Sequence, residues 1–195
     1  MKRCGFFALI LLAAGAATAA AEGNHSSAPS AAKCGGLTWR LKTFSDLRRE
    51  RVNDTPKGTT IAGIHQRHGP GHPPHIRSTP FQLQSWEVPA QVTSYKLDAT
   101  GSVRLVLYDD GAYINAVIPS PTCLSARSRD RAAITTTWRE FMDKCGKATE
   151  NWQPLGAILF VSGLGFWGPK GVSRGGAPNG AELHPVTGLR IVAGC

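Results

Sequence analysis

Two side chains near the C-terminus could act together in acid–base chemistry or metal binding. Glu182 and His184 are separated by one residue in a segment of strand-like composition, so both should point to the same face of a sheet. A carboxylate beside an imidazole can orient the ring for general-base catalysis or for metal ligation. No nucleophile or third ligand accompanies the pair, and it could equally brace the preceding loop. Glu182 and His184 are therefore weak catalytic candidates, and a binding protein is favoured over an enzyme.

Four histidines lie within eleven residues of one another. Closely spaced imidazoles in a loop could bind copper, zinc or nickel. Three prolines stiffen the same segment, and no carboxylate or thiolate supports the cluster, so a polar linker is the favoured interpretation and no cofactor is predicted. The weak metal-binding candidates are His65, His68, His72 and His75.

Aromatic, basic and amide side chains recur on one predicted sheet face and in the glycine-rich loop that follows residue 166. Aromatic rings next to arginine form stacking platforms for bases or sugars, while the guanidinium meets phosphate. The same residues are also ordinary components of a half-exposed sheet. Besides Tyr95, the predicted ligand-binding residues are Arg104, Tyr108, Tyr113, Asn115, Trp167, Lys170, Arg174 and Asn179.

The sequence gives no support for a serine, cysteine or aspartate nucleophile. The phosphate-binding motif GxxxxGK[ST] is absent. Asp109 and Asp110 could ligate a cation in a nuclease-like hydrolase, but adjacent acids before a glycine are the usual chemistry of a turn.

The N-terminal residues 1–21 have the pattern of a signal peptide. Lys2 and Arg3 precede a short apolar run and an alanine-rich stretch suited to cleavage near Ala21. The mature protein is therefore expected to be periplasmic or extracellular, with no transmembrane segment. Of 22 lysines and arginines, 20 remain without these two, against 13 acidic residues, a formal charge of +7. This charge favours acidic partners such as nucleic acid, anionic glycan or a membrane surface.

Four cysteines remain after the signal peptide: Cys34, Cys123, Cys145 and Cys195. An even number in an oxidising compartment predicts two disulfides, for which three pairings are possible. The favoured pairing joins Cys123 to Cys145 around a helical segment and Cys34 to Cys195.

The order of predicted elements indicates a mainly β fold. Residues 22–80 should form an N-terminal extension and a linker rich in proline and histidine, with strand-like alternation at 37–43. In residues 81–195, three strands, a helix and two strands predict an OB-like five-stranded barrel (βββαββ) with the helix between strands 3 and 4. The expected strands span 84–97, 103–108, 112–118, 155–166 and 181–192, and the expected helix spans about 129–144.

Several segments resemble a family of secreted bacterial proteins of unassigned function. The resemblance covers about residues 37–191 and includes LTWRLKT, VNDTP, YKLD, LVLYDDG, AVIPSPTC, GFWG and, most specifically, APNGAELHPV. It implies an OB-like domain and export, but no known activity. Family members often carry Asp-Tyr-His, Glu and His-Gly-Gln where this chain has 102–104 (Ser-Val-Arg), Val117 and 170–172 (Lys-Gly-Val). These replacements favour binding over catalysis.

The sequence thus predicts a secreted OB-like protein that binds an extended anionic or polar polymer, with single-stranded nucleic acid first and glycan second. A metal-dependent nuclease-like hydrolase and an envelope module that binds another protein are the alternatives. The oligomeric state is not determined by the sequence.

Overall fold

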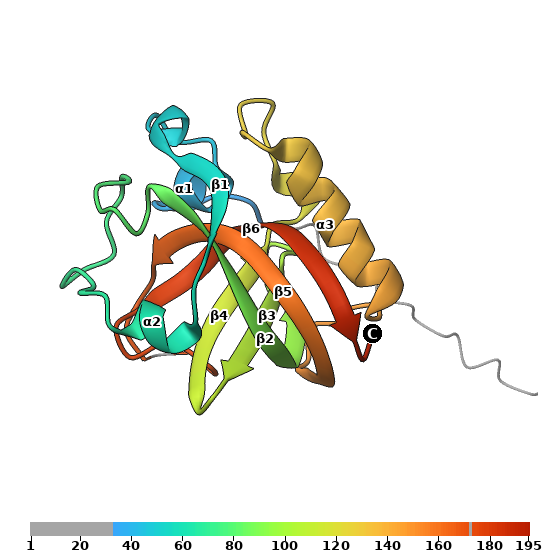
Figure 1. The fold of residues 1–195 in the computed structure, drawn as a ribbon. Coiled ribbons are helices and arrows are strands. Elements are labelled where there is room, and N and C mark those ends of the chain that lie inside the picture. The colour runs from blue at the N-terminus through green and yellow to red at the C-terminus, as the bar shows by residue number, and fades with distance from the viewer. Residues whose placement is uncertain (1–32, 172) are drawn as a thin grey trace, which may run out of the picture. The chain divides into compact units, whose positions relative to one another are not determined.

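Six strands form a single sheet that closes into a ring in this computed structural model, which describes residues 33–171 and 173–195 (Figure 1). The strand order is β1-β2-β3-β4-β6-β5, and β5 pairs back onto β2. The strands are β1 (Asn53–Gly58), β2 (Gln84–Leu97), β3 (Val103–Asp109), β4 (Ala112–Ile118), β5 (Gln153–Trp167) and β6 (Ala181–Ala193). The helices are α1 (Trp39–Lys42), α2 (Ile61–His65) and α3 (Arg131–Lys144), with 3-10 turns η1 (Arg49–Arg51) and η2 (Pro121–Cys123).

The predicted mainly β class is confirmed, and α3 lies between the third and fourth of the five predicted strands. β1 is a sixth strand that the sequence did not indicate, and it pairs in parallel with the first half of β2. The expected strand at 37–43 is wrong, because residues 39–42 form the short helix α1. Leu41 and Thr43 are buried, as an alternating pattern predicts, but they lie in and directly after a helical turn and not in a sheet. The predicted signal peptide lies outside the described residues.

A bulge in β2 changes which side chains face the inside of the ring. Val88 and Val92 are fully buried, as their alternation predicts, but the register shifts between Val92 and Ser94. After this shift the odd-numbered Tyr95 is buried, and its ring packs edge-on against Phe141 of α3 with the ring centroids 5.2 Å apart. The prediction that Tyr95 lies on the outward face is therefore wrong, because an extra residue in a strand reverses its alternation.

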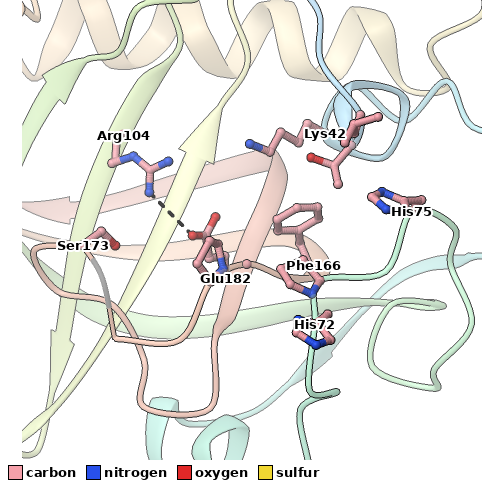
Figure 2. A pocket seen from close by; sticks show the side chains of 12 residues that line it. Lys42, His72, His75, Arg104, Phe166, Ser173 and Glu182 are labelled. Atoms are coloured by element: carbon pink, nitrogen blue, oxygen red, sulfur yellow. Dashed lines mark ion pairs between the residues drawn. The ribbon is translucent and has the colours of Figure 1, made fainter.

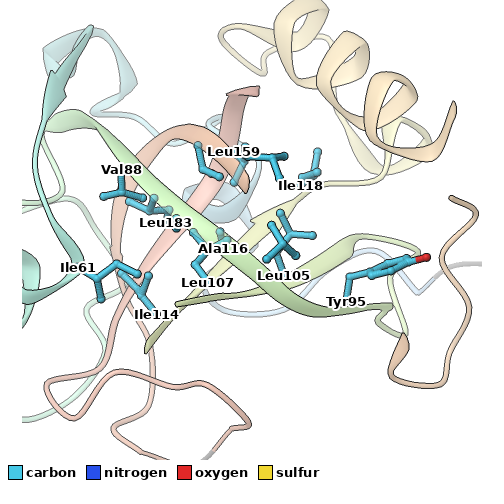
Figure 3. Packing of buried hydrophobic residues seen from close by; sticks show 14 of the residues in the cluster. Ile61, Val88, Tyr95, Leu105, Leu107, Ile114, Ala116, Ile118, Leu159 and Leu183 are labelled. Carbon is cyan, nitrogen blue, oxygen red and sulfur yellow. The ribbon is translucent and has the colours of Figure 1, made fainter. Parts of the chain in front are cut away.

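Regular pairing of β3 with β4 helps to fill the ring with branched aliphatic side chains (Figure 3). Leu105 and Leu107 of β3 meet Ile114 and Ile118 of β4, and none of these four is exposed to solvent. This packing fixes the alternate residues of the same strands, including Arg104 and Tyr108, on the outside of the sheet.

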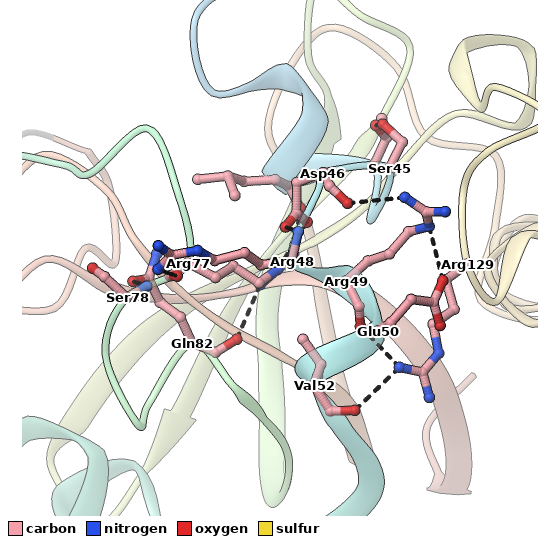
Figure 4. Close-up of polar contacts among 12 residues, drawn as sticks. Ser45, Asp46, Arg48, Arg49, Glu50, Val52, Arg77, Ser78, Gln82 and Arg129 are labelled. Carbon is pink, nitrogen blue, oxygen red and sulfur yellow. Dashed lines mark hydrogen bonds and ion pairs between the residues drawn. The ribbon is translucent and has the colours of Figure 1, made fainter.

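A buried ion pair joins the segment before β2, which carries Arg77, to the segment after α1, which carries Asp46 (Figure 4). The Arg77 guanidinium is fully buried and donates through Nε to Asp46 Oδ2 at 3.0 Å. It also donates through Nη2 to the Leu41 carbonyl at 2.7 Å and through Nη1 to the Gln82 carbonyl at 3.2 Å. Every nitrogen of this guanidinium therefore has an acceptor, and the acceptors come from two segments of the chain, residues 41–46 and residue 82. Such saturation is what a buried charge requires.

A second arginine joins α3 to the same segment. The Arg129 backbone N–H donates to the Phe44 carbonyl, and its guanidinium donates to the carbonyls of Arg49 and Val52. It also forms an ion pair with Asp54. The start of α3 is thereby fixed beside η1 and β1.

The disulfide pairing differs from the favoured prediction. Cys34 pairs with Cys123, and Cys145 pairs with Cys195, with Cα–Cα distances of 5.5 and 4.2 Å. Cys123 lies in η2, before α3, and Cys145 caps the C-terminal end of α3, and each is bonded to a cysteine from a distant part of the chain. The bridges instead join η2 to the N-terminal segment and the end of α3 to the last residue.

In the described part of the chain, no helix combines the length and apolar character needed to cross a membrane.

The disulfide pairing can be checked directly. Proteolysis of the unreduced protein followed by mass spectrometry should yield peptides linking Cys34 to Cys123 and Cys145 to Cys195. Replacing Cys145 and Cys195 by alanine opens a loop of 50 residues and should lower the free energy of unfolding by about 4 kcal/mol in the chain-entropy model. A peptide linking Cys123 to Cys145 would contradict this arrangement.

The Arg77–Asp46 pair should dominate the stability of the N-terminal segment. Arg77→Met leaves a buried carboxylate without its partner and should lower the free energy of unfolding by about 3–5 kcal/mol in urea denaturation. The matched control is Lys144→Met, which breaks the exposed Lys144–Glu140 pair and should cost less than about 1 kcal/mol. Equal losses in the free energy of unfolding for the two substitutions would show that burial does not increase the contribution of the Arg77–Asp46 pair to stability.

Candidate functional site

A cavity of about 600 Å³ lies at the beginning of β6, outside the ring (Figure 2). We call it the β6 pocket. Its walls come from α1 and the two residues before it, from β3, from the end of β5 and the start of β6, and from loop residues at 72–75, 168–169 and 173. It is lined by Leu37, Thr38, Lys42, His72, Pro73, His75, Arg104, Phe166, Gly168, Pro169, Ser173 and Glu182.

Positively charged groups surround a single carboxylate in this pocket. Arg104 Nη1 lies 3.7 Å from Glu182 Oε1, and Lys42 Nζ lies 5.6 Å from the centre of the Phe166 ring. His72 and His75 are exposed and lie on the opposite wall. Such a pocket offers cations for an anionic group, an acceptor for hydroxyl or amine groups and an aromatic surface for an apolar ring face.

Behind the carboxylate lies His184, as the alternation of β6 predicts. Its Nδ1 is 3.8 Å from Glu182 Oε2, beyond hydrogen-bond distance, and this buried nitrogen has no hydrogen-bond partner among the described residues. Burial lowers the pKa of His184 to about 4, and the nearby Lys42 and Arg104 act in the same direction against the Glu182 carboxylate. His184 is therefore neutral at neutral pH.

Glu182 itself remains ionised although it is buried. Burial alone would raise the pKa of this carboxyl, but His184, Arg104 and Lys42 outweigh burial, and the net pKa lies below its usual value. With a neutral imidazole and an ionised carboxylate, the pair has the protonation states of a hydrogen-bond acceptor site and not of a general acid.

The backbone leaves room for this carboxylate. A Cβ at Gly168 would lie 2.7 Å from Glu182 Oε1, closer than real contacts allow. Asn115, the β4 register partner of Glu182, donates from Nδ2 to Ser173 Oγ at 2.6 Å. Its Oδ1 is buried without a partner in the described part of the chain. The pocket thus adjoins buried polar atoms whose hydrogen-bonding capacity is unused.

Of the predicted ligand-binding residues on the strands, three lie where a ligand could reach them. Arg104 lines the β6 pocket, and the Tyr108 and Tyr113 rings lie 4.9 Å apart at the far end of β3 and β4. Tyr113 is 43% exposed. Asn115 is fully buried and holds the loop at Ser173, so it has a structural contact in place of an open surface.

The predicted loop residues divide in the same way. Lys170 and Arg174 are exposed. Trp167 is 1% exposed, packs against Phe81 and donates from its indole nitrogen to Thr79 Oγ1 at 2.9 Å. Asn179 donates to the carbonyls at positions 64, 65 and 67 and so holds α2. The prediction that Trp167 stacks on a ligand is wrong, because its ring belongs to the core.

The four histidines do not converge. His65 lies against the Tyr113 carbonyl, with 2.9 Å between Nε2 and the oxygen, whereas His72 and His75 line the β6 pocket and His68 is exposed. Within residues 33–171 and 173–195, no group of three or more histidine, cysteine, aspartate or glutamate side chains is placed to hold a metal ion. Asp109 and Asp110 lie at the turn between β3 and β4, where Asp110 has a positive φ of 43°.

One aromatic residue that the sequence analysis did not single out lies next to this face. The Trp152 ring lies close to two cations, with Lys96 Nζ and the Arg174 guanidinium each 5.3 Å from its centre. Lys96 is the register partner of Arg104, so this cluster adjoins the β6 pocket across β3. Only the strand pairing and the course of the 168–180 loop bring these residues together; an isolated tryptophan in a loop gave no signal.

Comparison with known proteins gives no family assignment. No family model matches the chain, and no curated protein matches it. Among solved structures, it is similar to a putative aspartyl-tRNA synthetase from Leishmania major Friedlin, with a TM-score of 0.43 and 12% sequence identity. The similarity covers 74% of this chain and 22% of that chain. At this level the similarity carries no functional argument.

The buried imidazole should make stability depend on pH. Because the folded pKa of His184 is about 4 and the unfolded value is near 6.5, the unfolded chain binds the extra proton, and stability falls as pH drops below about 6.5. Between pH 6.5 and 4.5 the loss should be about 2 kcal/mol. The Glu182 carboxyl also loses its contribution to stability as pH falls, but at pH values below this window, because its folded pKa lies below the usual value.

Urea denaturation of the wild type and of His184→Gln at several pH values measures this slope. The substitution should flatten the curve between pH 6.5 and 4.5, whereas the exposed control His68→Gln should leave it unchanged. A wild-type curve that is flat in this window would show that His184 is not held neutral.

Proposed function

We propose that this chain is a secreted OB-like protein that binds an extended anionic polymer, single-stranded nucleic acid first and anionic glycan second. The proposed binding surface is the outer face of β2 and β3, from the Trp152 cluster to the β6 pocket. The wider proposal of export is compatible with the two disulfides.

The observation that supports this proposal best is the cluster of Trp152, Lys96 and Arg174. A partly exposed aromatic ring next to two cations has the composition of a polymer-binding platform, because bases or sugar rings stack on the indole while the cations meet phosphate or carboxylate groups. OB folds commonly bind their ligands on the corresponding strands and loops, which adds an argument by analogy.

Further cations extend this cluster into the β6 pocket. Arg104 is the register partner of Lys96, and Ser173 in the pocket wall immediately precedes Arg174. Lys42 stands on the other side of the pocket. A chain lying on Trp152 could therefore place a following unit in the pocket, where the Glu182 carboxylate would accept hydrogen bonds from base N–H or sugar hydroxyl groups.

The direct test is fluorescence polarisation with labelled single-stranded DNA, RNA and polygalacturonate. Affinity should fall with salt, since each phosphate contact releases counterions, and the double substitution Lys96→Glu, Arg174→Glu should weaken binding at least about tenfold and flatten the salt slope by about 1–1.5. Trp152→Ala should weaken binding of any ligand that stacks by about 1–3 kcal/mol.

The matched control is the double substitution Lys57→Glu, Arg190→Glu, which changes the net charge equally at exposed positions outside this surface. Repeating the assay with divalent cations and analysing the polymers on gels tests the hydrolase alternative, which predicts cleavage. Absence of binding to all three polymers at low salt, or equal losses in both double variants, would refute the proposed surface.

A further inference from the structure

A second cavity, of about 440 Å³, lies on the other side of α1 and has a different composition. We call it the arginine groove. It is lined by Trp39, Arg40, Thr43, Ser45, Leu47, Arg49, Ser125, Ala126 and Arg127. In contrast to the β6 pocket, no carboxylate lines it. Residues from two distant segments, 39–49 and 125–127, form its two walls.

The charge in this groove is largely unneutralised. The side chains of Arg40 and Arg127 are exposed and form no ion pair or hydrogen bond with any other described residue. Arg49 pairs with the exposed Glu50 and donates to the Asp46 carbonyl. The groove therefore presents two unpaired guanidinium groups, which suit an oxyanion such as phosphate. The three hydroxyl side chains beside them already form hydrogen bonds with neighbouring residues.

Large apolar side chains project at the same place. Leu47 and Leu37 are 88% and 86% exposed, more than any other large apolar residue in the described part of the chain. Leu47 lines the groove together with Trp39, whereas Leu37 lines the β6 pocket on the other side of α1. An exposed leucine is unremarkable alone, but Leu47 with a tryptophan beside unpaired arginines forms an amphipathic surface.

The outward position of Leu47 is fixed by the buried ion pair (Figure 4). Asp46, directly before it, is bound by Arg77 and accepts a hydrogen bond from the Arg48 backbone N–H at 3.0 Å. Arg48, directly after it, donates from Nη1 to the Arg77 carbonyl at 2.7 Å. With both neighbours held in this way, Leu47 cannot turn inward without breaking these contacts, so its exposure is built into the fold.

We propose that the arginine groove and its exposed leucine dock this protein onto an anionic lipid bilayer. Arg40 and Arg127 bind lipid phosphate groups, and Leu47 and Trp39 enter the interfacial region, where tryptophan and leucine side chains are favourable. Basic side chains near an anionic surface add to this binding. The formal net charge of residues 22–195, +7, favours the same partner. This surface lies apart from the Trp152 cluster, and the inference does not depend on polymer binding.

Co-sedimentation of the full chain with vesicles tests the proposal, using phosphatidylcholine alone and phosphatidylcholine mixed with phosphatidylglycerol. Binding should require phosphatidylglycerol and weaken with salt. The double substitution Arg40→Glu, Arg127→Glu should reduce it by about 25-fold or more, at about fivefold or more for each arginine. Leu47→Asp should reduce it severalfold without loss of folding, because this side chain makes little contact with the protein.

Matched control variants distinguish binding through the groove from nonspecific effects of net charge or of exposed apolar side chains. Lys57→Glu, Arg190→Glu carries the same charge change, and Val192→Asp replaces another exposed apolar residue, 54% exposed on β6. All variants share the same N-terminal residues, so membrane binding by those residues would be equal in all of them. Lys96→Glu, Arg174→Glu should bind vesicles like the charge control, which distinguishes this surface from the proposed polymer site.

Three outcomes would overturn the proposal: equal binding to both vesicle types, groove variants that bind like their controls, or binding of inorganic phosphate in calorimetry with no binding to vesicles. The last outcome would assign the groove to a soluble anion instead.

Discussion

The buried ion pair between Arg77 and Asp46 is the constraint on which the functional surfaces depend. It joins the segment around α1 to the chain just before β2, and each guanidinium nitrogen has an acceptor. A charge removed from water in this way is tolerated only while its partners stay in place. The segment that carries Lys42 and Leu47 is therefore fixed against the ring, and the walls of both cavities that flank α1 are fixed with it.

The same short helix, α1, supplies lining residues to both cavities, but the two cavities differ in charge. On one side, Lys42 faces a pocket whose carboxylate is kept ionised by neighbouring cations. On the other side, Arg40 faces a groove without a lining carboxylate. Because a helix turns by about 100° per residue, positions 40 and 42 point about 200° apart, and four residues suffice to supply both surfaces. The pocket suits a ligand with both donor and anionic groups, whereas the groove suits an anionic surface.

The strands show how far alternation alone can predict a binding face. Alternation predicts that Arg104 and Tyr108 lie outside the ring and that Glu182 and His184 share one face. The structure agrees, because β3 and the start of β6 are regular in the residues concerned. Alternation failed for Tyr95, where the bulge in β2 reverses it. Trp167 was also misplaced, because the loop beyond it folds back and its ring is covered by residues 79–81.

The sequence by itself determined the mainly β class, the bounds of β2 and β4, the position of α3 and the pairing of Glu182 with His184 on one face. These features arise from local periodicity and from turn residues, which act over a few positions. Tertiary structure decided the disulfide pairing, the sixth strand, the burial of Arg77 and the assembly of Lys96, Trp152 and Arg174 around one ring. Each of these joins residues far apart in the chain, and their proximity depends on how the ring closes and what packs over it, which no local pattern encodes.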